Sequence, residues 1–514
     1  MSGRRVQPDQ SEHPGRERSW FLGHPTGLPV IVALKAWELF SYQGMRAFLV
    51  FYLIAAFGLS DARAAMLFGS YAALVLATSV LGGALSDRWL GQREPTFAGA
   101  LMIMGGHATL AAQHLLVATG WLQGEAIFQV FCLGLGLIAV GTGLLKPNVL
   151  NLIGGLYRRD DPKREDGFYI YYLGVNVGSF LAPLVCGRLA QDYGWGWGFG
   201  AAAIGMAAGL CVLLAGRRHL VRADGQSTGR GPGDRPPRIR IYGGVGVTVL
   251  LASFLIQHGL VLGALLAATL AAGCGYLLVV AARDRSGEDR RAVLRLMAVL
   301  PVPLCFVMVF EQFSLAINLF VDRLVDKQVL GFHVAAPQLL SLNSFFVLLL
   351  LPLLGLGWTR LRAHGAEPAI PVKFTIGFGL MGAGFWLLAG AIMLQPAGAA
   401  ISMSWVVGAY LLITLGELMI APLTYTLVGR AVPARLEGVA MGLLLLSFAL
   451  GNLCAGLLAT LAAVPRDASL DMMSGIYGRH FIVVGGVALA AGLCALALRM
   501  IVSPAQSDSK ETSR

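Results

Sequence analysis

Apolar runs of about 20 residues recur along almost the whole chain, and this is the length that a helix needs to cross a bilayer. About 14 such runs can be counted in the 514 residues. Only 13% of the residues are charged, against about 25% in a typical soluble chain. The alternative, a large soluble all-α protein, does not fit charge this sparse. The sequence therefore predicts an all-α, multi-pass membrane protein.

The runs are grouped as six, two and six. We expect a disordered cytoplasmic tail, a six-helix bundle, a cytoplasmic linker, two additional membrane helices, a second six-helix bundle and a second tail, over residues 1–27, 28–216, 217–240, 241–292, 293–501 and 502–514. The linker is rich in Arg, Gly and Pro. The first tail lacks the short apolar core and cleavage site of a signal peptide.

Basic connections follow every second run, as in SDRWLGQRE, YRRDDPKRED and RDRSGEDRRAVLR. Lys and Arg concentrate in the cytoplasmic loops of membrane proteins, so this spacing predicts that both termini are cytoplasmic. It also explains the net charge of +11 without a nucleic-acid partner. We expect the protein to lie in the inner (plasma) membrane, as a monomer.

Several kinds of chemistry are not indicated. The seven cysteines form no CxxC pair, so neither a metal site nor a disulfide framework is expected. No Gly-rich phosphate loop occurs, so any driving force would be a gradient rather than ATP. No nucleophile, base and orienting group occur together in an enzyme motif. We therefore expect no cofactor and no enzymatic activity.

The two sets of six runs show a trace of duplication. LGGALSDRWLGQRE follows the second run, and LGLGWTRLRAHG lies at the equivalent place in the second set. Two repeated halves with a site between them at mid-membrane are a common transporter architecture. The alternative is that short basic loops of this kind arise in any membrane protein.

The first run carries an unusual set of charges, in KAWELFSYQGMRA. A charge at the centre of a membrane helix costs about 2.5–3.5 kcal/mol. At 100° per residue, Lys35, Glu38, Tyr42 and Arg46 fall within about 80° of one face and extend over about 16 Å. Lys35 could snorkel toward the membrane surface, but Arg46 is followed by further apolar residues. The pattern favours a polar stripe that faces a cavity between helices.

Three more charges lie inside apolar runs: Lys146, Glu311 and Glu417. Buried charges are costly unless they are paired. Since the cations Arg46 and Lys146 belong to the first half and the acids to the second, pairs across the halves are the natural arrangement. A pair that forms in one state and breaks in another would act as a gate.

Asn176 and Asn343 add uncharged hydrogen-bonding groups to apolar surroundings. Each could simply bond a neighbouring helix. Together with two cations and two acids, they describe a cavity suited to a zwitterion. The cations would hold a carboxylate, and Glu417 with the asparagines would hold an ammonium group.

The sequence resembles the proton-dependent oligopeptide transporter (POT, or PTR2) family of the major facilitator superfamily, from about Glu38 to Gly451. The resemblance rests on segments that match family signatures in order: ELFSYQGMRAFLVFYL, LGGALSDRWLGQRE, IAVGTGLLKPNV, YYLGVNVGSFLAP, FEQFSLAINLFVDR, SLNSFF and GELMIAPL. It implies a major facilitator fold of two six-helix bundles, with two additional helices between them that are typical of bacterial members.

The resemblance also implies roles for particular residues. Arg46 and Lys146 would hold the carboxyl end of a peptide, and Asn176, Asn343 and Glu417 its amino end. Tyr42 would line the pocket. Arg46 with Glu311, and Lys146 with Glu417, would be the pairs across the halves. Lys35 and Glu38 occupy positions of the family's proton-handling motif.

The chain departs from the family in that motif. Where the family has Glu-x-x-Glu-Arg, this chain has Lys35, Glu38 and Leu39. The net charge of these positions is zero here, as in the family motif with one proton bound. We hypothesise that Lys35 pairs with Glu38 at i, i+3 and mimics the protonated state.

The aromatic residues of the family's pocket are also changed. The tyrosine position of the second helix is Leu76, a tryptophan upstream of Glu311 is absent, and a Trp-Phe pair is leucine in MGLLLLSF. The interpretation that follows is alternating-access transport of di- or tripeptides or peptide-like compounds, with proton symport as the family default. The alternatives are transport of another organic anion or amino-compound metabolite, and a sensor that has lost transport.

Overall fold

The computed structural model describes residues 23–158, 161–220, 236–283, 287–329, 331–396 and 399–497. These residues are almost entirely helical, and thirteen of their helices are long and apolar enough to cross a membrane. A fourteenth, α3, has 26 residues but is less apolar, because it carries polar residues such as His107 and Gln113. With α3 included, the described helices of spanning length match the predicted six, two and six.

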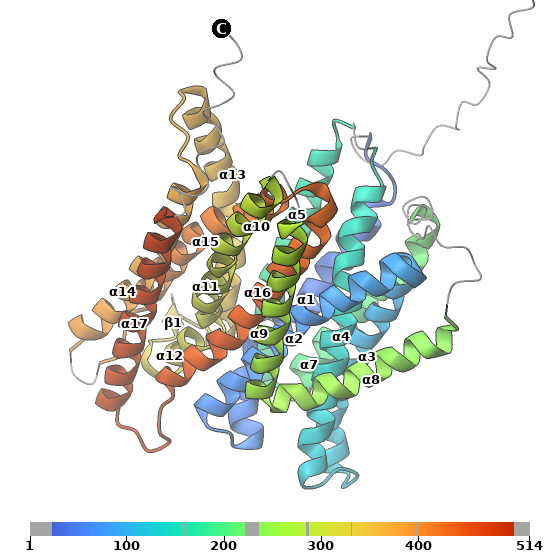
Figure 1. The fold of residues 1–514 in the computed structure, drawn as a ribbon. Coiled ribbons are helices and arrows are strands. Elements are labelled where there is room, and N and C mark those ends of the chain that lie inside the picture. Colours follow the sequence, from blue (N-terminus) through green and yellow to red (C-terminus); the bar gives the residue numbers. More distant parts are fainter. Residues whose placement is uncertain are drawn as a thin grey trace, which may run out of the picture.

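The first half occupies one side of the molecule in Figure 1, from blue to green. Its helices are α1 (Leu28–Phe57), α2 (Asp61–Leu85), α3 (Arg93–Ala118), α4 (Glu125–Gly155), α5 (Arg164–Ala182) and α7 (Trp195–Gly216). The α5 span continues through the π turn η3 (Pro183–Gly187) into α6 (Arg188–Asp192), α2 is followed by the π turn η2 (Ser86–Leu90), and α7 by the 3-10 turn η4 (Arg217–Leu220).

The second half occupies the other side, from yellow to red. Its first span is broken into α10 (Glu288–Val299), α11 (Pro301–Phe310), the 3-10 turn η7 (Glu311–Phe313) and α12 (Ala316–Leu324). The later spans are η8 (Ala336–Leu340) with α13 (Ser341–Ala363), α14 (Ile370–Leu394), α15 (Met403–Ala431), α16 (Ala434–Ala459) with η9 (Thr460–Ala462), and α17 (Leu470–Ala497).

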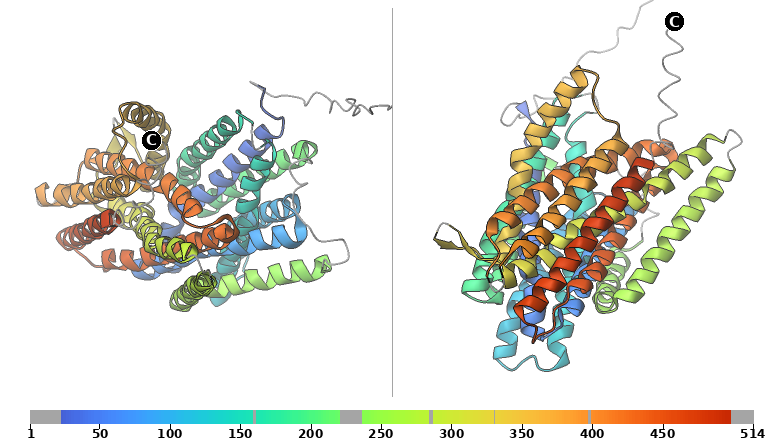
Figure 2. Two further views of the ribbon diagram at one scale, coloured as in Figure 1. Left: turned by 45° about the horizontal axis from the view of Figure 1, so that its top comes forward. Right: turned by 90° about the vertical axis from the view of Figure 1, so that its left-hand side faces the viewer.

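A short antiparallel hairpin of β1 (Gln328–Val329) and β2 (Phe332–His333) connects α12 to η8. It projects from the side of the molecule in the right-hand view of Figure 2. Gln328 pairs with His333 and Val329 with Phe332. This hairpin lies in a connection and leaves the two-bundle architecture unchanged.

The additional helices are α8 (Arg238–Gln257) and α9 (Gly259–Ala282). They lie along the outside of the bundles in Figure 1, where α8 packs on α4 and α9 packs on α16. The pair therefore bridges the two halves from outside. The expected tails lie outside the described residues, except for 23–27, and so do residues 221–235 of the expected linker.

The two halves meet most closely where α2 packs against α16. A Cβ atom added to Gly69 would lie 2.9 Å from the carbonyl oxygen of Asn452 and 3.0 Å from Cα of Gly456. Only a residue without a side chain allows the two backbones to approach this closely, which is how small residues serve helix packing in membranes.

Candidate functional site

Lys35 and Glu38 form an ion pair within α1. Their residues are only 5% and 2% exposed, so the pair lies inside the bundle. Lys35 therefore does not snorkel toward the surface. The contact has the i, i+3 geometry hypothesised from the sequence, and it neutralises both charges within one helix.

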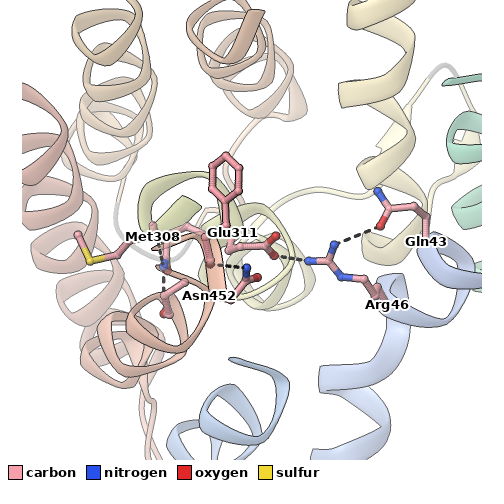
Figure 3. Close-up of polar contacts among 8 residues, drawn as sticks. Gln43, Arg46, Met308, Glu311 and Asn452 are labelled. Carbon is pink, nitrogen blue, oxygen red and sulfur yellow. Dashed lines mark hydrogen bonds and ion pairs between the residues drawn. The ribbon is translucent and has the colours of Figure 1, made fainter. Parts of the chain in front are cut away.

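Arg46 and Glu311 form an ion pair that joins the two halves. Figure 3 shows the Arg46 guanidinium between Gln43 and Glu311, and the Arg46 to Gln43 hydrogen bond measures 3.3 Å. The two paired residues are 8% and 7% exposed. The guanidinium also lies 5.1 Å from the ring centroids of Tyr42 and Phe68, within range of cation–π attraction. Arg46 is thus held by a carboxylate of one half and aromatic rings of the other.

Glu311 owes its position to a break in its span. The α-helix α11 ends at Phe310, and the 3-10 turn η7 separates it from α12. Irregular backbone at membrane depth occurs where it is buried in protein or lines a cavity. Broken helices commonly build the sites of secondary transporters. The break places Glu311 beside α1 rather than along the face of a continuous helix.

Asn343 and Glu417 come together within the second half. Asn343 lies in the first turn of α13 and donates from Nδ2 to Oε2 of Glu417 at 2.6 Å. The same amide nitrogen lies 3.1 Å from Oγ1 of Thr414, one turn earlier in α15. A hydrogen bond to a carboxylate is stronger than one between neutral groups, so Asn343 fixes the orientation of Glu417.

Lys146 has a different environment from the expected one. Among the described residues it makes no ion pair with Glu417, whose carboxylate accepts a hydrogen bond from Asn343. Lys146 lies in α4 next to Pro147, and its side chain is partly buried. The expected pair with Glu417 is therefore absent in this conformation.

Asn176 is buried, but its amide does not reach across the halves. Its Nδ2 donates to the carbonyl oxygen of Tyr172, four residues earlier in α5, at 2.9 Å. The α5 helix packs against α13 of the second half, but the Asn176 amide is bonded within α5 in this conformation.

A narrow cavity separates Arg46 from Asn343. Its volume is about 30 Å³, and Ser179, Phe310 and Tyr410 are among the residues that line it. That is room for about one or two waters. Tyr410 stacks on Phe313 with centroids 4.3 Å apart. The walls therefore contain aromatic residues, although the family's aromatic positions in the second helix and in MGLLLLSF are aliphatic here.

Tyr71 is a second residue that the sequence did not single out. It lies in α2, is fully buried, and has its ring centroid 6.3 Å from that of Tyr42. Its hydroxyl finds no hydrogen-bond partner among the described residues. Buried polar groups are rarely unpaired, so within the described part of the chain this hydroxyl is an unsatisfied hydrogen-bonding group close to Tyr42 and Arg46.

A further ion pair joins the halves at the end of the bundle that carries the α1–α2 connection. Arg323 of α12 donates to both carboxylate oxygens of Asp61, at 2.5 and 2.8 Å, and to the Tyr477 hydroxyl at 3.0 Å. Asp61 Oδ2 also accepts from the backbone N–H of Val464 at 3.0 Å. This cluster is not evident from the sequence, because Asp61 and Arg323 lie at helix ends, where charged residues are common.

The other polar contacts between the halves lie toward the same end. The Asn318 amide donates to the carbonyl of Ala47 at 2.9 Å, and the Ser341 hydroxyl to that of Phe180 at 2.7 Å. Arg466 donates to the carbonyl of Gly58. Among the described residues, then, the halves are bonded from the level of Arg46 to the α1–α2 connection. This grouping explains why Lys146 and Glu417, on the other side of Arg46, are not paired.

Comparison with known proteins identifies the family of this chain. The POT family model matches residues 96–234 and 244–474. The chain is 31% identical to the peptide transporter YePEPT of Yersinia enterocolitica, over 94% of this chain and 95% of that one. It is 30% identical to dipeptide and tripeptide permease A of Serratia proteamaculans, over 98% and 97%.

The fold is also that of a solved relative. A crystal structure of a mutant of peptide transporter POT in complex with alafosfalin matches with a TM-score of 0.80 and 31% identity, over 94% of this chain and 96% of that one. A match of this extent shows that the chain has the major facilitator fold of that transporter. With the family model covering most of its length, this membrane protein belongs to the POT family.

Proposed function

We propose that the protein is a secondary transporter that moves di- or tripeptides, or peptide-like amino compounds, across the inner membrane by alternating access. The observation that carries the proposal is the buried Arg46–Glu311 pair, which links the two halves beside Asn343 and Glu417. Cations and acids on opposite sides of one cavity suit a zwitterion. The relatives support the same conclusion, since they are named as a peptide transporter and a dipeptide and tripeptide permease.

In this proposal, Arg46 and Lys146 bind the substrate carboxylate. Glu417 binds the ammonium group together with Asn343, which holds its carboxylate, and with Asn176 of α5. Tyr42 lines the pocket against Arg46. The cavity between Arg46 and Asn343 is only about 30 Å³, so the halves have to separate there before a dipeptide can occupy it.

Arg46 connects substrate binding with this separation. In the present conformation its guanidinium is occupied by Glu311. A substrate carboxylate competes with Glu311 for the same donors, and a proton on Glu311 removes its attraction for Arg46. Either event weakens a contact between the halves, so protons and substrate can both act on the same gate.

Proton coupling through the first helix is altered in this proposal. Lys35 holds Glu38 in an ion pair, which keeps the segment at the charge that the family motif has after binding a proton. Glu311 and Glu417 are then the remaining groups that can exchange a proton during transport.

We further propose that both termini lie in the cytoplasm and that the protein acts as a monomer. The basic connections support this orientation. The end closed by Asp61 and Arg323 then faces outward, and the described conformation is inward-facing. Residues 1–27 and 502–514 would be tails, 217–240 a cytoplasmic linker, and 28–216 and 293–501 the two bundles, with 241–292 between them.

Uptake of dialanine by purified protein in liposomes tests the proposal. Dialanine accumulation that needs an inward proton gradient supports symport, whereas equal uptake without the gradient supports facilitated transport. Liposomes containing the Glu417→Gln variant are the matched control, because this change removes the charge proposed for the ammonium group and little volume. The absence of uptake for any di- or tripeptide would overturn the proposal.

A further inference from the structure

A second cavity lies outside the first half, between α3, α4, α7 and α8. Its volume is about 460 Å³. It is formed where α3 begins, α7 ends and α8 begins, so its rim lies at one face of the membrane. It is separate from the cavity beside Arg46, with which it shares no lining residue. The additional helix α8 supplies one of its walls through Tyr242.

The rim of this cavity is basic. Arg93, the first residue of α3, donates to the carbonyl oxygen of Arg217 at 3.1 Å. Glu94 is the acid at the rim, and it accepts from Arg238 at 2.9 Å and from the Tyr242 hydroxyl at 3.1 Å. Both oxygens of the Glu94 carboxylate are thus bonded to residues of α8. The Arg217 guanidinium has no carboxylate partner within the described ranges, which leaves the rim with excess positive charge.

The floor of the cavity is apolar. Phe97 and Ala98 lie about one helical turn below Arg93, and Leu213 and Leu214 lie about one turn below Arg217. Phe97 and Leu214 are 38% and 43% exposed, on the outer surface of the bundle. The cavity therefore combines a cationic rim at the membrane face with an apolar groove that opens toward the lipid.

We propose that this cavity binds an anionic phospholipid, with the phosphate group at Arg93 and Arg217 and one acyl chain in the groove below. Basic pockets between membrane helices on the cytoplasmic side are suited to anionic headgroups. A free phosphate would leave the groove unfilled, and a zwitterionic lipid would leave the excess charge unbalanced. The proposal gives α8 a role, because Arg238 of this helix neutralises the Glu94 carboxylate, which would otherwise repel the headgroup.

Native mass spectrometry of the full chain, with phosphatidylglycerol or phosphatidylcholine added, tests this site. We expect the protein to retain phosphatidylglycerol in preference to phosphatidylcholine. Arg217→Gln should weaken phosphatidylglycerol binding about fivefold, the contribution of one basic residue at an anionic surface. Arg360→Gln is the matched control: Arg360 is an exposed arginine in the last turn of α13, in the other half, and its loss should leave binding unchanged.

A second variant, Ala98→Phe, fills the groove without changing charge. It should also weaken phosphatidylglycerol binding, while dialanine uptake continues because the cavity beside Arg46 is untouched. Three results would overturn the proposal: equal retention of the two lipids by the unmodified protein, unchanged phosphatidylglycerol binding in both variants, or the same thermal stabilisation by inorganic phosphate alone. The last result would identify a simple anion site.

Discussion

The guanidinium of Arg46 on α1 is paired with the carboxylate of Glu311, which lies at the break between α11 and α12. The two residues are 265 positions apart in the sequence and belong to different halves. Both are buried, so neither can lose its partner without leaving a charge in a poorly solvated place. This contact therefore helps to fix the relative position of the halves, and in the proposed function it also connects substrate binding with proton binding.

Replacing Arg46 should separate the structural role of this pair from its role in transport. Arg46→Gln leaves Glu311 buried without a cation, at a cost of about 3–5 kcal/mol, and should lower both thermal stability and dialanine uptake. The exchanged variant, Arg46→Glu with Glu311→Arg, restores the ion pair and should recover stability. Its uptake should stay low, because the cation has moved to the other half. Recovery of uptake in the exchanged variant would show that Arg46 does not bind the substrate.

Replacing Lys35 should change how transport depends on pH. Lys35→Glu puts a second carboxylate beside Glu38, and two close carboxylates cannot both remain ionised easily, so one of them takes up a proton. Uptake should then rise more steeply as external pH falls than it does in the unmodified protein. Lys35→Met, which breaks the ion pair without adding an acid, is the control. An identical pH profile for Lys35→Glu and the unmodified protein would contradict the proposed mimicry of the protonated state.

The two asparagines should differ in importance. Asn343→Ala removes a hydrogen bond to the Glu417 carboxylate, and such bonds contribute about 1.5–3 kcal/mol, so KM for dialanine should rise about tenfold or more. Asn176→Ala removes a bond to the backbone of its own helix and should have a much smaller effect. Competition by dialanine against a labelled peptide measures both. Equal losses would mean that the Asn176 amide turns toward the substrate in another conformation.

The Asp61–Arg323 contact should hold the outer end closed. Asp61→Asn weakens it, so a cysteine placed at Leu319, a buried residue in a cavity beside Arg323, should react several-fold faster with a membrane-impermeant maleimide in a cysteine-free background. Asp322→Asn is the matched control, since Asp322 and Lys327 form an exposed pair at the same end and such pairs contribute little. Unchanged labelling in Asp61→Asn would exclude this contact as a gate.

Two glycines of α16 offer a test of the seam between α2 and α16. A Cβ atom on Gly456 would lie 2.6 Å from the carbonyl oxygen of Ala65, whereas one on Gly442 meets its nearest atom only at 4.0 Å. Gly456→Ala should therefore destabilise the protein by about 1–3 kcal/mol through overpacking. Gly442→Ala should leave the melting temperature nearly unchanged, and similar melting temperatures for the two variants would argue against close packing at Gly456.

The sequence by itself determined the fold class and the charged residues of the candidate site. Apolar runs near 20 residues dictate membrane helices whatever their partners, and a charge such as Arg46 within a run marks an interior face because lipid cannot solvate it. The Lys35–Glu38 pair could also be predicted from the sequence, since residues three apart share a helix face. Each of these features depends on spacing along one helix.

Apart from the Arg46–Glu311 pair, which the family resemblance implied, tertiary structure decided which distant groups meet. It joined Asp61 to Arg323 and set Tyr71 against Tyr42, and it directed the Asn176 amide to its own helix. It also left Lys146 and Glu417 unpaired in this conformation, although their charges are complementary. These outcomes depend on how closely the two halves approach each other at each level of the bundle. That approach is set by packing between the halves, as where Gly69 meets Gly456, and the spacing of residues along a single helix does not carry this information.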